Sequence, residues 1–162
     1  MLYSTKSIKF PQNTILNILI SITYVFNKVL IRSIRMQSTE IKLLNESCKK
    51  VLEMPKIRFV GVLDKMGNKI AGGFKEGITS YLVDIDNQKL YIQSTLELSM
   101  RKDFDEDLGA IDYISTRRGK VTMISIPTNQ YLVLISAQRD IDVEKIINKV
   151  NSAFVMLPDI KP

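Results

Sequence analysis

The sequence predicts an α+β fold: a five-stranded antiparallel sheet with helices on both faces, in the order α-β-β-α-β-β-β-α. Helix-like and strand-like patterns follow that order from residue 39 to residue 157. The segments 121–126 and 131–136 are apolar at nearly every position, which is typical of central strands covered on both sides. Helices on both faces are the economical way to cover such strands.

The first helix is expected over residues 39–54, where Ser38 or Thr39 can cap its start and Pro55 stops it. Its apolar residues recur at helical spacing and form one stripe: Ile41, Leu44, Cys48, Val51 and Leu52. Because Cys48 lies on that stripe, we interpret it as a small buried hydrophobe rather than as a reactive thiol.

Residues 57–63 and 69–74 predict a β-hairpin. The first segment is rich in strand formers, and the turn contains Gly67, which is free to take a positive φ. Gly72 and Gly73 lie in the second strand. We interpret this pair as a place where backbone or a helix packs closely on the strand.

The second helix is expected over residues 86–104, with Asp84 or Asp86 as its cap. Five apolar residues share one of its faces and two more widen it: Ile85, Ile92, Leu96, Met100 and Phe104, then Tyr91 and Leu98. A helix apolar over so wide an arc has more than one surface to bury against, such as its own sheet and a partner.

Three strands are expected next, over residues 110–116, 121–126 and 131–136. A last helix follows, capped by Asp142 and stopped by Pro158.

The turn between the first two of these strands carries Arg117, Arg118 and Lys120. Guanidinium forks and turn amides could grip an anion there. A charged hairpin tip that discourages edge-to-edge aggregation explains the same residues. Both interpretations stay open.

The net charge of +6 is unevenly distributed. Residues 1–36 hold five basic residues and no acid, whereas residues 37–162 hold 18 basic and 17 acidic residues. We therefore expect a basic, apolar N-terminal segment over 1–36 and a single domain over 37–162. The near-neutral domain predicts no nucleic-acid partner, because such binding needs a basic stripe.

Residues 15–31 carry apolar side chains at helical spacing between basic flanks. An interfacial or packed helix, a membrane span and a tail or over-extended gene start all stay open. The first two would associate the chain with a membrane or pack an extra N-terminal helix.

The chain has no His and one Cys. This excludes an internal disulfide, imidazole bases and His-ligated metal sites. Asp103, Asp105 and Asp107 open like a calcium loop, but Leu108 and Ile114 stand where Gly and Glu are needed. We interpret 103–107 as an acidic solvated loop, and we expect no enzyme activity, no metal and no cofactor.

The element order and the hairpin GVLDKMGNKIAGG, through Gly61, Asp64, Gly67 and Ala71, resemble the roadblock family of dynein light chains. Several short sequence segments are also similar to a family of uncharacterised small proteins of ammonia-oxidising archaea (Thaumarchaeota). The segments that carry this second resemblance are 57–59, 65–67, 71–74, 99–105 and 108–109. Such proteins commonly begin near Met36.

The roadblock resemblance implies a homodimer through the second helix and the neighbouring strand, and a non-enzymatic platform for small Ras-like GTPases. The positions it implies are Tyr91, Thr95, Leu98, Lys102 and Tyr113. The archaeal resemblance implies a cytoplasmic protein, membrane-associated if residues 15–31 anchor it. The long N-terminal segment and the acidic 103–107 run depart from the roadblock pattern.

The alternative is a small-molecule sensor domain of profilin, GAF or PAS-like type. Such a domain shares an antiparallel sheet with flanking helices and would hold its ligand between sheet and helix.

Overall fold

The computed structural model describes residues 23, 24, 28, 37–128 and 130–154. The chain divides after Thr39 into two compact units, and the second contains the sheet. Most of the 15–31 segment lies outside the described residues, so the helix expected there stays a prediction. Among the residues that are described, no helix has the length and apolar character needed to cross a membrane.

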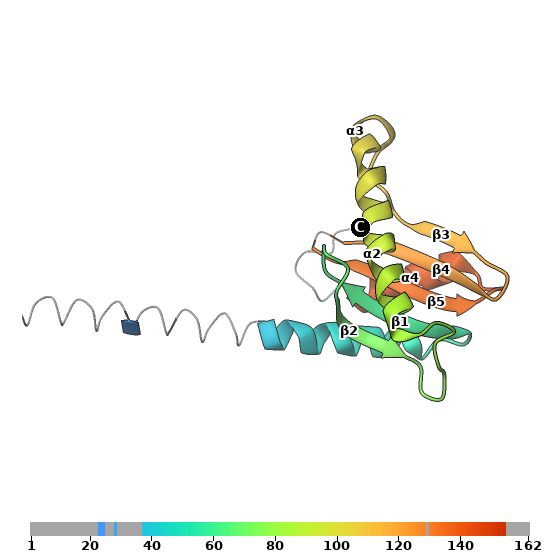
Figure 1. Ribbon diagram of the computed structural model, residues 1–162, viewed down its shortest axis with the longest axis horizontal. Helices are drawn as coiled ribbons and strands as arrows, with labels where there is room; N and C mark the ends of the chain where they lie inside the picture. Colours follow the sequence, from blue (N-terminus) through green and yellow to red (C-terminus); the bar gives the residue numbers. More distant parts are fainter. Residues whose placement is uncertain (1–22, 25–27, 29–36, 129, 155–162) are drawn as a thin grey trace, which may run out of the picture. The chain divides into compact units, whose positions relative to one another are not determined.

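A five-stranded antiparallel sheet confirms the predicted fold class (Figure 1). The strands lie in the order β2-β1-β5-β4-β3, so β5 is the middle strand and β1 and β4 flank it. Their bounds are β1 Ile57–Leu63, β2 Lys69–Phe74, β3 Ile114–Arg117, β4 Val121–Pro127 and β5 Leu132–Gln138. The central position of β5 explains its continuous apolar run, since both of its faces are covered.

The helices confirm the predicted order but not every boundary. The first helix covers residues 37–52, α2 covers Asp84–Arg101 and α4 covers Val143–Phe154. Val83, not Asp84 or Asp86, holds the capping position of α2. The two aspartates instead lie in its first turn, where a carboxylate favourably meets the positive end of the helix dipole.

The acidic 103–107 run is helical, which corrects the expected loop. The 3-10 turn η1 (Lys102–Phe104) and the short helix α3 (Asp105–Leu108) continue directly from α2. Gly109 ends them with a φ of 85°, a backbone conformation that glycine adopts at little cost. Residues 110–113 are consequently outside β3, which is shorter than the expected strand.

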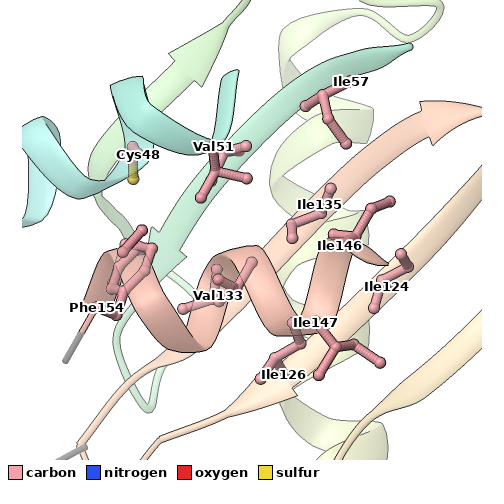
Figure 2. Packing of buried hydrophobic residues seen from close by; sticks show 14 of the residues in the cluster. Cys48, Val51, Ile57, Ile124, Ile126, Val133, Ile135, Ile146, Ile147 and Phe154 are labelled. Carbon is pink, nitrogen blue, oxygen red and sulfur yellow. The ribbon is translucent and has the colours of Figure 1, made fainter. Parts of the chain in front are cut away.

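The first face of the sheet carries most of the core (Figure 2). Residues 40–52 of the first helix pack here together with α4, and both Cys48 and Phe154 are almost fully buried. Among the described residues, seventeen buried ones form the core cluster on this face. The opposite face, under α2, has six: Phe59, Leu63, Tyr91, Leu98, Leu132 and Leu134. Helices therefore lie on both faces. On the second face, the part of the chain that the structure describes contributes α2, which leaves some of the sheet uncovered.

At Gly72 the backbone of β2 lies close to its neighbours, as expected from the glycine pair. Its φ is 82°, and a Cβ atom there would collide with the carbonyl oxygen of Val60 and lie 3.0 Å from the sulfur of Cys48. Its N–H donates to Oδ1 of Asn45 at 2.9 Å, which ties β2 to the first helix. Gly73 is different, because a Cβ atom there would meet nothing within 4 Å.

Candidate functional site

A cavity of about 490 Å³ lies between α2, residues 80–82 and the sheet. Its floor is apolar and comes from the sheet face that α2 leaves partly uncovered: Phe59, Phe74, Met123 and Leu134. Ligand pockets of proteins commonly have this size and an apolar floor of this kind.

Aromatic rings organise one side of the cavity. The rings of Phe59 and Phe74 lie 4.8 Å apart, and Phe59 stacks on Tyr91 at 5.7 Å. Burial raises the pKa of Tyr91, and the nearby charge of Asp84 raises it further. The phenol therefore stays neutral at physiological pH, and the floor carries no negative charge from it.

Four cations border the cavity: Arg58, Lys89, Arg118 and Lys120. The single acid among the lining residues is Asp86, whose Oδ1 lies 3.2 Å from Nζ of Lys89. The rim is therefore strongly basic, although the domain as a whole is nearly neutral.

Tyr81 holds two of these cations against its ring. The guanidinium carbon of Arg58 lies 4.1 Å from the ring centroid, and Nζ of Lys120 lies 5.4 Å from it. Such cation–π contacts stabilise a charge without neutralising it. Nη2 of Arg58 also donates to the carbonyl oxygen of Thr79 at 3.0 Å, which orients the guanidinium group.

The structure places only two of the three residues of the predicted anion contact, all at the β3–β4 turn, beside the cavity. Arg118 and Lys120 border the cavity, whereas Arg117 does not. The N–H of Arg118 donates to the carbonyl oxygen of Val121 at 2.7 Å and closes the turn. The sequence pattern alone could not show this division, because it depends on which side of the turn faces α2.

A second feature is the exposed side of α2. Four side chains of the wide apolar face point away from the sheet and form a row, here named the α2 apolar row: Ile85, Ile92, Leu96 and Met100. Their exposed fractions are 67%, 46%, 57% and 63%. Phe104 and Leu108, at 59% and 82%, continue exposed apolar surface into η1 and α3.

The predicted interface residues occupy several different environments. Tyr91 and Leu98 are buried against the chain's own sheet, and Thr95 is half-buried with its hydroxyl donating to the carbonyl oxygen of Tyr91 at 2.8 Å. Lys102 is exposed in η1. Tyr113 packs at the opposite core cluster. The structure therefore does not bring the five together on one surface, and their role in an interface stays a prediction.

Tyr113 has a specific partner inside the chain. Its hydroxyl donates to Oε1 of Glu144 at 2.8 Å. This hydrogen bond to a carboxylate raises the pKa of Tyr113, with the negative charge of Glu144 adding to the effect. The contact ties the segment before β3 to α4.

The sequence pattern places the α2 apolar row together with Tyr91 and Leu98, since all of them fall within one broad arc. The structure divides that arc, because only Tyr91 and Leu98 face the sheet. The width of the arc was the signal that a second surface existed.

Within the described residues, no cluster of three acidic or Cys side chains could hold a metal ion.

Solved structures with a similar fold include a roadblock/LC7 domain and two MglB proteins. A roadblock/LC7 domain from Streptomyces avermitilis aligns with a TM-score of 0.53 and 9% identity, over 70% of this chain and 89% of the other. The gliding protein MglB from Thermus thermophilus aligns with a TM-score of 0.60 and 9% identity, over 70% and 84% of the two chains. MglB from Myxococcus xanthus gives 0.51 and 10%, over 70% and 86%. The fold is therefore of the roadblock/LC7 type.

The model of a family of unknown function, DUF6659, matches residues 36–155, and this chain belongs to that family. No curated protein is significantly similar to it in sequence.

Proposed function

We propose that this chain is a non-enzymatic interaction module: a homodimer built on α2 that scaffolds or regulates a small Ras-like GTPase. The observation that carries the proposal is the α2 apolar row. Four large apolar side chains lie together on one exposed helix face, and such patches commonly mark protein–protein interfaces. Burying one of them stabilises a complex by about 1.5–3 kcal/mol.

The edge of the sheet offers a second surface for self-association. Strand β3 pairs with β4 on one side and with no described strand on the other. Ser115 and Thr116 of β3 are exposed. A free strand edge presents unpaired backbone groups that a second chain can bind. One MglB structure is described as having a tetrameric arrangement, which supports self-association as a property compatible with this fold.

The GTPase partner rests on resemblance to the roadblock family and on the fold. Fold by itself does not fix function, so the partner needs a direct test. A Ras-like GTPase of the same organism, purified and loaded with GDP or with a non-hydrolysable GTP analogue, would be titrated with the full chain. Nucleotide-dependent binding or a changed hydrolysis rate supports the proposal, and binding to neither form contradicts it.

The dimer is tested by light scattering of the full chain over a range of concentrations. Leu96→Arg is the informative substitution, because Leu96 is 57% exposed and tolerates a polar side chain in the monomer. Leu98→Arg would be ambiguous, because Leu98 is buried and the substitution would damage the fold itself. In a twofold dimer each substitution acts twice. We expect a loss of about 3 kcal/mol or more, over a hundredfold in Kd.

Leu43→Arg is the matched control. Leu43 is also an exposed leucine, 40% accessible, but it lies on the first helix, away from α2. We expect this variant to keep the mass of the unmodified chain. A monomeric unmodified chain, or a Leu96→Arg variant that associates as strongly as Leu43→Arg, contradicts the proposed interface.

The cavity beside α2 favours a second candidate function, that of a small-molecule sensor domain. A ligand held between sheet and helix is what such a domain requires.

A further inference from the structure

We propose that the cavity beside α2 binds a small organic phosphate with an aromatic body. This site is separate from the α2 apolar row, and the proposal does not depend on the dimer. It rests on the floor, the charge of the rim and the fixed position of one arginine.

The floor of the cavity favours a ligand with an apolar group. Phe59, Phe74 and Met123 line a cavity of about 490 Å³, which suits one small organic molecule. Phe74 and Met123 are partly exposed, and both pack against the buried cluster under α2. A flat aromatic ligand would remove this apolar surface from water and offer ring contacts to the phenylalanines.

The rim selects an anion. Lys89 has Asp86 as its counter-charge, but no carboxylate among the described residues lies within 4.0 Å of Arg58, Arg118 or Lys120. Three cations thus share one rim without an acidic partner. A dianionic phosphate group relieves their mutual repulsion and accepts hydrogen bonds from guanidinium and ammonium groups together.

The side chain of Arg58 is already oriented in the free protein. Its guanidinium carbon lies over the ring of Tyr81, and the carbonyl oxygen of Thr79 accepts a hydrogen bond from Nη2. An oriented side chain loses less entropy on binding than a free one. Lys120 contacts the same tyrosine ring, so two cations of the rim are held at one place.

The probe is 1-naphthyl phosphate, which combines the two chemical features and is fluorescent. Its binding to the full chain would be measured by fluorescence anisotropy and by calorimetry. Two further ligands separate the features, 1-naphthol as the aromatic body alone and inorganic phosphate as the anion alone. We expect 1-naphthyl phosphate to bind at least ten times more tightly than either, with an affinity that falls as salt is raised.

A double variant tests the rim. Arg118→Ala with Lys120→Ala removes two exposed cations at the tip of the β3–β4 turn. We expect its affinity for 1-naphthyl phosphate to fall at least tenfold. Arg117→Ala with Lys69→Ala is the matched control, because it removes the same charge from exposed residues that do not line the cavity. We expect its affinity to stay within twofold of the unmodified chain.

Several results would overturn the proposal. Equal binding of 1-naphthol and 1-naphthyl phosphate would show an apolar pocket without anion selectivity. No binding of 1-naphthyl phosphate, or equal loss in both double variants, would remove the site altogether. Light scattering of the same variants tests an alternative, in which the acidic helix α3 of a second copy of the chain occupies the cavity. A lower mass for the cavity variant, with no change in ligand affinity, would assign the cavity to that contact instead.

Discussion

Substituting Gly72 by alanine should destabilise the domain far more than the same substitution at Gly73, its neighbour in β2. Gly72 has a φ of 82°, and its Cβ would collide with the carbonyl oxygen of Val60 on β1. Gly72 and Gly61 are paired residues of the two strands, so the collision falls inside the β1–β2 ladder. Gly73 has open space at the corresponding place.

The magnitude follows from two costs. A left-handed conformation costs a residue with a Cβ about 1–2 kcal/mol. Moving β2 to relieve the collision weakens the partly buried hydrogen bond from the Gly72 N–H to Asn45. A hydrogen bond whose donor is left unpaired in this way costs about 1–3 kcal/mol. We expect a total of about 2–5 kcal/mol, a large part of the roughly 5–15 kcal/mol by which typical domains are stable.

Urea unfolding followed by far-ultraviolet circular dichroism measures the difference. With a slope of about 2 kcal/mol/M, the urea midpoint of Gly72→Ala should fall by roughly 1–2.5 M. Gly73→Ala should leave the midpoint unchanged or raise it slightly, because alanine reduces the entropy of the unfolded chain. The reasoning is refuted if Gly72→Ala unfolds within about 0.5 kcal/mol of the unmodified chain, or if both variants lose the same stability.

Two ionisable groups give further predictions. Burial raises the pKa of Cys48 to about 12, so iodoacetamide at pH 8.5 should alkylate the folded chain at least about a hundredfold more slowly than the chain in urea; equal rates would contradict the buried thiol. Burial, and then the hydrogen bond that Tyr131 donates to Glu40, raise the pKa of Tyr131 to about 12. Because the folded value lies above the ordinary value of about 10, the stabilisation is complete below pH 10 and is lost as the pH rises towards 12. Tyr131→Phe should remove an absorbance step at 295 nm near pH 12 and flatten the pH dependence of unfolding there, and an unchanged titration curve would count against this contact.

Patterns within single elements predicted much of the architecture. Helical spacing located the first helix and α4, and the unbroken apolar runs of β4 and β5 identified central strands. These patterns work because a residue's burial follows the period of its own element. The close approach at Gly72 was predictable for a similar reason, since glycine in a strand commonly marks one.

The end of α2 was harder to predict. Asp105, Glu106 and Asp107 form a helical turn that continues from η1, although an acidic run is equally compatible with a solvated loop. Propensity is a weak guide over so few residues, because neighbouring structure decides the outcome.

The sequence by itself determined the fold class, the order of the elements and the presence of surplus apolar surface on α2. Tertiary structure alone decided which part of that surface stays exposed, because this depends on the angle at which α2 meets the sheet. It also decided that Arg118 and Lys120 join Arg58 at one cavity while Arg117 lies outside it. Residues far apart in the chain meet only once the sheet has formed, and no local period records such a meeting.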